Sequence, residues 1–244
     1  MAFYGCKSLT RFNVPKSVTS IGGSVIGGNN LSVITVDPQN TVYDSRENCN
    51  AIIETATNKI IAGCKNTAFP ASVTEIGEDA FEGCEGMKSI EIPGTVKTIG
   101  FDAFRISSLN KVVIHDGVEK IDLQAFDSCI YLRKITIAKS VADIHSNAFI
   151  GTQNLTIYGF KDSEAEKLAK LRGYKFVRFG DVNDDESIDV LDAVMVQKYA
   201  SGKTTLTEDQ ISAADVNFDG VADTLDAVQI QKFASGKISE FKMK

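Results

Sequence analysis

Apolar residues recur with a period of 22 or 23 positions through the first two thirds of the chain. Each unit carries an Ala-Phe pair, and isoleucine and valine positions before it keep the same step. A period of this length predicts a solenoid, in which every unit buries its apolar side chains against the next unit. The pairs are Ala80-Phe81, Ala103-Phe104, Ala125-Phe126 and Ala148-Phe149.

Each unit also contains two short segments with strand character. The pattern is L-x-x-I-x-I-P-x-x-V-x-x-I-G-x-x-A-F-x-G-C, which predicts one strand around 87–92 and a shorter one around 96–99. The longer strand of each unit could line a binding face, and the side chains that alternate with its apolar residues are then candidate ligand contacts. For each residue taken alone, a solvated sheet surface is the favoured explanation. These candidates are Arg11, Asn13, Ser89, Glu91, Lys111, Lys134 and Thr136.

The period breaks once, where about ten extra residues lie between positions 37 and 68. Two apolar runs, 50–53 and 59–62, flank the dipeptide Thr57-Asn58, and this arrangement predicts a β-hairpin. We favour an elongated repeat that leaves the stack intact over a protruding binding element.

Residues 159–177 are expected to close the stack. Ser163 and Glu166 have the spacing of a capping box, residues 164–172 form the predicted helix, and Gly173 stands where that helix ends. Residues 174–177 follow as a last strand. A solenoid needs such a cap because its final unit would otherwise expose apolar side chains and an unpaired strand edge.

The repeat pattern resembles the BspA-like leucine-rich repeats of bacterial surface and secreted proteins. The resemblance covers residues 1 to about 158 and implies the solenoid fold. It says little about function, because repeat scaffolds serve many partners. The chain starts in the middle of a unit, at Met1-Ala2-Phe3, and has neither a signal peptide nor a long apolar segment. We interpret this start as a truncation.

A second repetition lies beyond the solenoid. Residues 181–203 and 215–237 are two copies of one 23-residue segment, 34 positions apart, with 15 identical positions. Each copy opens with oxygen-bearing side chains at every second residue and continues into an amphipathic helix. A single acidic run of this kind is quite often a solvated turn, but two complete copies favour a pair of calcium loops.

The loops provide oxygen atoms at positions 1, 3, 5, 7, 9 and 12, which are the offsets of an EF-hand loop. Position 7 would act through its backbone carbonyl. The candidate ligands are Asp181, Asn183, Asp185, Ser187, Asp189 and Asp192 in the first loop, and Asp215, Asn217, Asp219, Val221, Asp223 and Asp226 in the second. The pattern therefore predicts two bound Ca²⁺ ions.

Two positions depart from an ordinary EF-hand loop. Position 12 is aspartate in both copies, and position 6 is Gly220 in the second loop but Glu186 in the first. A residue other than glycine with a positive φ angle carries an energetic cost. We expect the first loop to bind calcium more weakly than the second.

The charge distribution agrees with a cation site at the C-terminal end. Residues 180–244 contain 13 acidic residues and 6 lysines, a net charge of −7, so the rest of the −6 chain carries +1. Bound calcium would offset this crowding, and in a module of about 60 residues its binding energy is expected to support folding. The acidic balance argues against nucleic acid as a partner.

Two loop–helix units with aspartate at position 12, joined by a short helix at 207–214 whose Thr207 and Gln210 have capping-box spacing, resemble a type I dockerin. The resemblance covers residues 180–240. It implies calcium-dependent binding to a cohesin module of a bacterial cellulosome scaffoldin. Residue by residue, it places cohesin recognition on Val190, Leu191, Gln197 and Lys198 in the first copy, and on Thr224, Leu225, Gln231 and Lys232 in the second.

Some of these candidate cohesin-binding residues could instead have a purely structural role. A small module needs its leucines for a core, so at least one of Leu191 and Leu225 could be buried, and Lys198 and Lys232 could belong to a solvated face. The family also suggests two docking orientations related by about 180°. Because the copies differ at Val190 against Thr224 and at Met195 against Gln229, we expect one orientation to be preferred.

Catalytic chemistry finds no support in the sequence. In the sequence, no Cys, Ser or Glu stands at a catalytic-motif spacing from His115 or His145. There is also no nucleophile elbow, zinc-helix motif or phosphate loop. Cys6, Cys84 and Cys129 each follow a repeat aromatic by three positions and are expected to face inward. Cys49 and Cys64 lie in the irregular segment and could pair, with one disulfide at most.

The sequence thus predicts an α+β chain in two domains. Residues 1–179 form BspA-like repeats with a cap at 159–179, and residues 180–244 form a small all-α dockerin with two EF-hand-like loops. The expected role is that of a secreted, extracellular, non-catalytic cellulosome component without a membrane span. The alternatives are the anchoring part of a larger enzyme whose catalytic module lies upstream, or a stand-alone adhesin stabilised by calcium.

Overall fold

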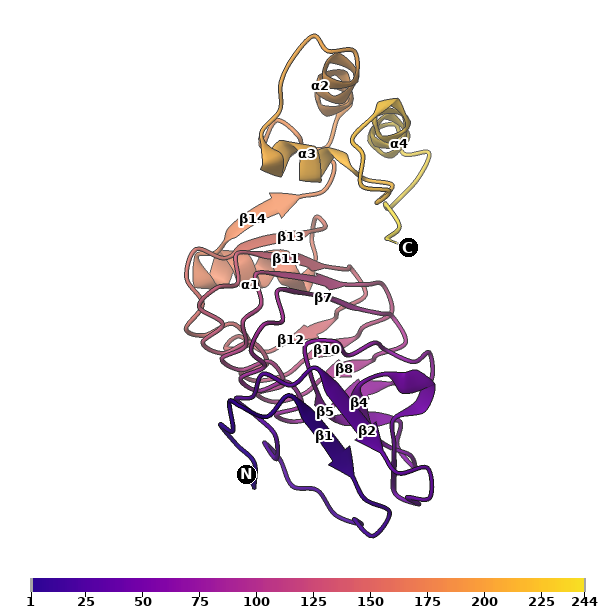
Figure 1. The fold of residues 1–244 in the computed structure, drawn as a ribbon. Helices are drawn as coiled ribbons and strands as arrows, with labels where there is room; N and C mark the ends of the chain where they lie inside the picture. Colours follow the sequence, from indigo (N-terminus) through magenta and orange to yellow (C-terminus); the bar gives the residue numbers. More distant parts are fainter. Residues whose placement is uncertain (1, 244) are drawn as a thin grey trace. The chain divides into compact units, whose positions relative to one another are not determined.

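The computed structural model describes residues 2–243, so Met1 and Lys244, the outer ends of the predicted domains, lie outside the described residues. The fold is a β-solenoid of about eight turns followed by three helices that pack together (Figure 1), which confirms the predicted fold class. Contacts divide the chain into two compact units. The first comprises residues up to 135 together with 140–155, and the second comprises 136–139 together with 156–244.

The first unit contains a seven-stranded sheet, to which each regular turn contributes one short strand and the elongated repeat contributes three. Four of its strands are parallel and in register, so that Ile76, Ile99, Ile121 and Ile144 align one period apart. The order is β12 (Asp143–Ile144), β10 (Lys120–Ile121), β8 (Thr98–Ile99), β6 (Glu75–Ile76), β5 (Lys59–Gly63), β4 (Ala51–Glu54) and β3 (Tyr43–Asp44). The strand register thus places the isoleucine of each sequence repeat beside the isoleucine of the next repeat.

The longer strands of the repeat pair separately. In the first unit β1 (Arg11–Val14) pairs in parallel with β2 (Val33–Val36), and β7 (Ser89–Ile92) with β9 (Lys111–Ile114). Strand β11 (Lys134–Ile137) contributes residues to both units. Alternate side chains point outward: of the seven predicted surface residues, Arg11, Asn13, Ser89, Glu91 and Lys111 are exposed, while Lys134 and Thr136 are half-buried.

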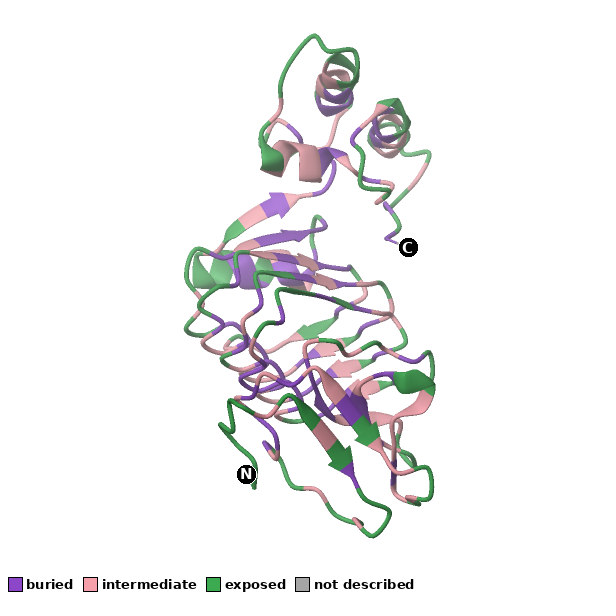
Figure 2. Cartoon of the chain, in the orientation of Figure 1, coloured by how far each residue is buried: buried purple, intermediate pink, exposed green. Residues whose placement is uncertain are grey.

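Stacked phenylalanines form the core of the solenoid. The rings of Phe81, Phe104, Phe126 and Phe149 follow one another with centroids 4.9, 5.1 and 5.2 Å apart and nearly parallel planes. Backbone bonds between turns fix this spacing, because the amide of Phe81 donates to the carbonyl of Ala103 at 2.7 Å and the next turns repeat the bond. Buried positions therefore recur in every turn (Figure 2).

The predicted hairpin is confirmed. Strands β4 and β5 are antiparallel, the short helix η1 (Arg46–Asn48) precedes them, and β5 continues the sheet by pairing in parallel with β6. The column of turns stays unbroken, since the amide of Gly28 donates to the carbonyl of Glu82 at 3.0 Å across the extra residues. The insertion is an elongated repeat inside the stack, as expected from the sequence.

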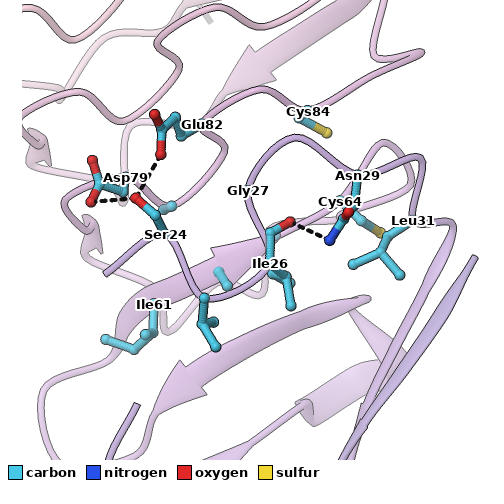
Figure 3. A pocket seen from close by; sticks show the side chains of 14 residues that line it. Ser24, Ile26, Gly27, Asn29, Leu31, Ile61, Cys64, Asp79, Glu82 and Cys84 are labelled. Carbon is cyan, nitrogen blue, oxygen red and sulfur yellow. Dashed lines mark hydrogen bonds between the residues drawn. The ribbon is translucent and has the colours of Figure 1, made fainter. Parts of the chain in front are cut away.

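A small polar cavity marks the seam where the insertion joins the regular turns (Figure 3). The hydroxyl of Ser24 lies between two acidic side chains, 2.8 Å from Asp79 Oδ2 and 2.6 Å from Glu82 Oε2. On the other side, Asn29 donates to the carbonyl of Ile26 at 2.9 Å. These bonds satisfy the Ser24 hydroxyl and the Asn29 amide nitrogen, whereas Asn29 Oδ1 is buried with no hydrogen-bond partner among the described residues.

The cysteines follow the prediction with one exception. Cys84 and Cys129 are buried as expected, but Cys6 is exposed, so the expectation of an inward-facing side chain is wrong there. Its turn is held by backbone bonds to residues 25 and 27, and in the described part of the chain it has this neighbouring turn on one side alone. Cys49 and Cys64 are free thiols in the structure and donate to different carbonyls, those of Ala51 and Asn50.

The second unit contains the predicted cap. Strand β13 (Thr156–Gly159) pairs in parallel with β14 (Lys175–Arg178), and α1 (Glu164–Arg172) lies between them in sequence. Ser163 caps the helix through the amide of Glu166, and Gly173 ends it with φ of 70°. The capping box itself is only half formed, because the Glu166 carboxylate accepts the amide of Asp162 at 2.6 Å instead of the amide of Ser163.

Three helices complete the unit: α2 (Val190–Ala200), α3 (Glu208–Ala214) and α4 (Thr224–Ala234). The faces of α2 and α4 that pack together bury small and branched side chains, Ala193 and Val196 on one helix and Ala227 and Ile230 on the other. The predicted capping box of α3 is confirmed, with Thr207 and Gln210 bonding to each other's backbone amides. The duplicated sequence thus produces two equivalent helices around a shared core.

Polar contacts join these helices to the cap within the second unit. Asp209 lies at the start of α3. Its Oδ1 accepts a hydrogen bond from the Tyr158 hydroxyl and its Oδ2 forms an ion pair with Lys175 Nζ, both at 2.5 Å. Burial and the neighbouring Asp209 carboxylate raise the pKa of Tyr158, which keeps its hydroxyl protonated as the donor. The cap and the helices therefore pack as one compact unit.

Candidate metal-binding loops

Each candidate loop ends in a capping box that fixes two of its acidic side chains. Asp189 precedes α2 and accepts the amide of Leu191 at 2.6 Å, while Asp192 accepts the amide of Asp189 at 2.8 Å. Asp223 and Asp226 repeat this geometry before α4, at 2.6 and 2.9 Å. Loop positions 9 and 12 are held by the helix N-terminus, where negative charge is favoured.

The position-12 carboxylates are fully buried. Asp192 Oδ1 accepts the amides of Val182 at 2.8 Å and Asn183 at 3.1 Å, which lie at the start of the same loop. Asp226 has the same bonds to Val216 and Asn217, at 3.0 and 3.1 Å. Each aspartate thereby closes its loop from end to end.

Burial raises the pKa of both carboxyl groups, against the opposing effect of the backbone amides. Burial also raises the pKa values of the position-1 carboxyl groups, Asp181 and Asp215. A buried carboxylate is costly without a compensating positive charge. A divalent cation in each loop would provide that charge.

Positions 1, 3 and 5 point toward the backbone of their own loop. The amide of Asp185 donates to Asp181 Oδ1 and Asn183 Oδ1, at 3.1 and 3.0 Å, and Asp185 itself accepts the amide of Ser187 at 2.9 Å. The second loop repeats these bonds at Asp215, Asn217 and Asp219, with the amide of Val221 as the last donor. The side chains predicted as ligands are thus gathered around each loop in equivalent places.

Across residues 2–243, no three acidic, histidine or cysteine side chains converge in the arrangement of a preformed metal centre. The loop carboxylates are instead engaged by backbone amides. The donor set nevertheless fits calcium by its chemistry, since every candidate ligand atom is a hard oxygen at an EF-hand offset and the closing aspartates are buried. Calcium would be held by the twelve predicted residues, with Ser187 and Val221 using their carbonyls.

Position 6 has a left-handed backbone in both loops. Gly220 has φ of 90°, and Glu186 adopts φ of 70° without the freedom of glycine. The same sharp turn is therefore made at a cost of roughly 1 kcal/mol in the first loop. This backbone observation supports the expected weaker first loop.

The predicted recognition residues lie on the exposed faces of α2 and α4. Leu191 is 56% exposed and Leu225 61%, so the alternative that one of these leucines is buried in the core is wrong. Apolar periodicity could not settle this point, because Ala193, Val196, Ala227 and Ile230 supply the core instead. Val190, Gln197, Lys198, Thr224 and Lys232 are also exposed, and Gln231 is half-buried.

The structure adds Val228 to the exposed apolar residues of α4 and Val221 to those of the second loop. Neither stands among the predicted recognition residues. For Val228 the sequence carried a signal, since it follows Leu225 by three positions and shares its helical face.

Comparison with protein families identifies both parts of the chain. Six copies of the BspA-type leucine-rich repeat region match residues 1–64 and 52–170. The chain belongs to this repeat family. A type I dockerin domain matches residues 179–233 and includes both loops with the helices that follow them. The chain is therefore a BspA-type repeat region followed by a type I dockerin.

Several solved structures resemble part of this BspA-type chain. The pneumococcal vaccine antigen PcpA covers 70% of the chain at 13% identity with a TM-score of 0.46. A leucine-rich cell surface protein of Faecalibacterium prausnitzii covers 68% at 25% identity (TM-score 0.45), and a leucine-rich repeat protein of Eubacterium ventriosum covers 62% at 18% identity (0.44). The chain spans 56%, 51% and 48% of these structures, about half of their length. A comparison with curated proteins finds no match.

The two families define coarse properties of the protein. A dockerin implies a cohesin partner and is typically a calcium-binding module, while the repeats imply an interaction surface. Both matching families are non-catalytic modules. None of the helices among residues 2–243 is long and apolar enough to cross a membrane.

Proposed function

We propose that the protein is a secreted, non-catalytic component of a cellulosome. Its dockerin, residues 180–244, binds a cohesin module of a scaffoldin when calcium is present, and its repeats, residues 1–179 with the cap, present a surface to a protein or carbohydrate. The observation that carries the proposal is the pair of equivalent loops, each closed by a fully buried aspartate, Asp192 or Asp226. The extracellular location is supported by the dockerin family and by the cell-surface origin of one structural relative.

The twelve loop residues named above are the proposed calcium ligands. Calcium would replace backbone amides as the partner of several carboxylate oxygens and would neutralise charge that the fold gathers in each loop. Because metal binding requires the carboxylates to be ionised, and burial raises the pKa values of Asp192 and Asp226, calcium binding should weaken as the pH falls.

Cohesin recognition is proposed for the exposed residues at the N-terminal ends and outer faces of α2 and α4. An exposed leucine on each helix, Leu191 and Leu225, gives two similar apolar contact points beside lysines 198 and 232. Exposed apolar side chains with a polar rim are typical of protein-binding surfaces. The two faces are related by the internal repetition, so each could bind one cohesin in turn.

Titration of the protein against a panel of cohesins, first with calcium and then with a chelator, tests this function. We expect binding to at least one cohesin with calcium and none with the chelator. Asp226→Asn, which removes a buried charge from the second loop, should weaken calcium binding. Asp143→Asn, at an exposed position of the solenoid, is the matched control and should behave as the unmodified protein. Cohesin binding that persists in chelator contradicts the proposal.

A stand-alone adhesin is the second candidate, favoured by an aromatic cluster in the second unit. Phe218, at position 4 of the second loop, packs against Phe160 and Phe179 of the cap, with ring centroids 5.9 and 4.9 Å away. In this function the loops would serve to stabilise the cap. Calcium-dependent stabilisation of the protein without binding to any cohesin of the panel would favour it.

A further inference from the structure

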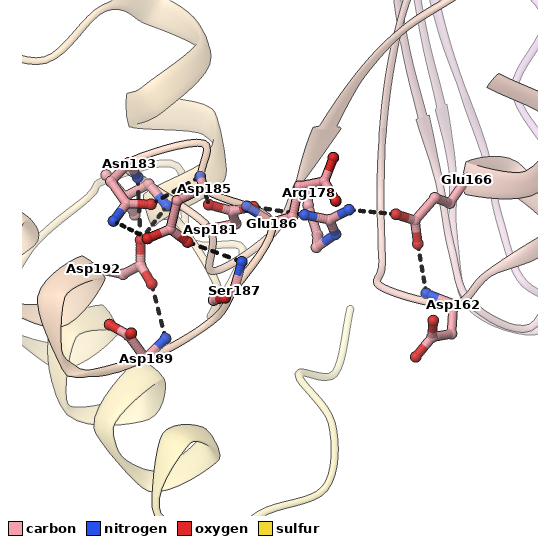
Figure 4. Close-up of polar contacts among 11 residues, drawn as sticks. Asp162, Glu166, Arg178, Asp181, Asn183, Asp185, Glu186, Ser187, Asp189 and Asp192 are labelled. Atoms are coloured by element: carbon pink, nitrogen blue, oxygen red, sulfur yellow. Dashed lines mark hydrogen bonds and ion pairs between the residues drawn. The ribbon is translucent and has the colours of Figure 1, made fainter. Parts of the chain in front are cut away.

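The first loop carries an ion-pair chain (Figure 4), and the described residues of the second loop have no equivalent of it. Arg178, the last residue of β14, lies three positions before the first loop residue. Its Nη1 donates to Asp181 Oδ2 at 2.6 Å, and its Nη2 donates to Glu166 of helix α1. Glu166 in turn accepts the amide of Asp162 at 2.6 Å, just before that helix. One guanidinium therefore connects the cap helix to loop position 1.

The groups in this chain are largely removed from solvent. The Arg178 side chain is 12% exposed and that of Asp181 1%. Charges in such a place are screened much less than surface charges, so each one strongly affects the others. The burial makes the ion pairs a property of the site rather than an incidental surface contact.

The duplicated loop provides an internal comparison. Asp215 receives the same two backbone amides as Asp181, from positions 5 and 6 of its loop, at 3.2 and 3.0 Å. The residue three positions before it is Ser212, whose hydroxyl donates to the carbonyl of Glu208 within α3. At position 1 the two loops thus have equal backbone bonds and differ by one positive charge.

We propose that Arg178 sets the calcium affinity of the first loop and connects its occupancy to helix α1 through Glu166. This inference rests on the proposed calcium binding. Asp181 Oδ2 accepts both the guanidinium and the amide of Glu186, whereas Oδ1 accepts only the amide of Asp185 and has room for an ion. The guanidinium keeps the carboxylate in place but sets a positive charge beside a divalent cation. Glu166 offsets part of that charge.

This arrangement predicts opposite effects for two substitutions. Arg178→Gln removes the repelling charge and should tighten calcium binding at the first loop by roughly three- to tenfold. Glu166→Gln leaves the guanidinium uncompensated and should weaken binding there by a similar factor. Arg178→Lys keeps the charge and should stay close to the unmodified protein. A merely structural role would make Arg178→Gln and Glu166→Gln both harmful.

Amide signals in NMR titrations with CaCl₂ can report each loop separately. Glu186 reports the first loop, Gly220 the second, and Asp162 the link to helix α1, because each of these amides donates to a carboxylate of its site. We expect the Glu186 signal to follow the predicted order of affinities while the Gly220 signal stays constant. The Asp162 signal should shift with first-loop occupancy in the unmodified protein and not in Arg178→Gln.

Ser212→Arg introduces the corresponding charge beside the second loop and keeps the test independent of how well the Arg178 variants fold. It should weaken calcium binding reported by Gly220. An unchanged or weaker first loop in Arg178→Gln, or an Asp162 signal that ignores calcium, overturns this inference while second-loop and cohesin binding uphold the proposed function. Absence of calcium binding at both loops of the unmodified protein overturns the two together.

Discussion

Phe179 and Phe218 meet edge to face, with ring centroids 4.9 Å apart and ring planes at 89°. One ring precedes the first loop and the other stands inside the second loop. We expect Phe218→Ala to lower the free energy of unfolding of the second unit by about 2 kcal/mol, because a half-buried aromatic ring is removed from three-ring packing. Thermal or urea unfolding with saturating calcium measures the change.

The control is the equivalent position of the first loop. Asp184 also has a left-handed backbone, with φ of 60° against 59° for Phe218, but its side chain is exposed. Asp184→Ala should change stability by less than about 0.5 kcal/mol. Equal losses for the two substitutions would show that loop backbone, and not aromatic packing, determines the effect.

Replacement of Glu186 by glycine separates backbone strain from charge in the first loop. Because Glu186 holds φ of 70°, glycine should relieve roughly 1 kcal/mol and bring calcium binding closer to that of the second loop. Gly220→Ala should do the reverse in the second loop. Calorimetric titration of both variants with calcium measures the shift, and a first loop that is already as tight as the second in the unmodified protein would contradict the prediction.

Paired substitutions can compare how much each of the two recognition faces contributes to cohesin affinity. One variant changes Leu191 and Lys198 to alanine, and the other changes Leu225 and Lys232. Since the faces differ at Val190 against Thr224, we expect unequal losses of cohesin affinity, with the larger loss on the preferred face. Calorimetry with a cohesin measures both. Equal small losses, with binding abolished only when all four residues are changed, would establish two equivalent orientations instead.

Asp102 is expected to make the stability of the solenoid depend on pH. Burial raises its pKa to about 6, although the neighbouring Arg105 acts in the opposite direction, and its Oδ1 has no hydrogen-bond partner among the described residues. In the unfolded chain the pKa is about 4. The folded protein therefore binds this proton more tightly, so the stabilisation from this group is complete below about pH 4 and is lost as pH rises to about 6.

Asp102→Asn removes this dependence and should raise stability at pH 7 by about 1 to 3 kcal/mol. Asparagine also tolerates the left-handed backbone at this position, where φ is 51°. Denaturant unfolding at several pH values between 4 and 7 measures the difference. Glu119→Gln, at an exposed ion pair with Lys97, should leave the pH profile unchanged.

The core stack should be sensitive to cavity formation. Phe126 is fully buried between Phe104 and Phe149, and Phe126→Ala is expected to cost about 3 to 5 kcal/mol in the unfolding of the first unit. Tyr131→Ala, at a half-exposed position of the same turn region, should cost far less. Unfolding followed by circular dichroism distinguishes the two, and similar costs would mean that the stack contributes little.

Much of the fold could be predicted because the solenoid repeats its own apolar positions. Phe81 and Phe104 stand in equivalent places of their turns, so one period determines both the register and the core. The hairpin at 51–63 was also predictable, since two apolar runs flank a short polar turn. Local patterns suffice where each element contacts its neighbour in sequence.

The remaining features depend on contacts that no local pattern encodes. Leu191 and Val196 are both apolar residues of α2, yet one is exposed and the other buried, because α4 covers only one face. The pairing of Glu166 with Arg178 requires helix α1 to approach the end of β14, and the capping-box spacing of Ser163 and Glu166 suggested a different partner. The exposure of Cys6 likewise depends on how many turns pack against its own.

The pairing of β13 with β14 has a mechanical consequence. The two strands are parallel over four register positions, and the chain passes from Arg178 through Phe179 and Gly180 directly into the first loop. Tension applied to α2 or α4 along the strand direction would load the backbone bonds of this pair together, in shear, instead of breaking them one after another. This geometry resists pulling, which would suit the proposed attachment of the protein through its dockerin.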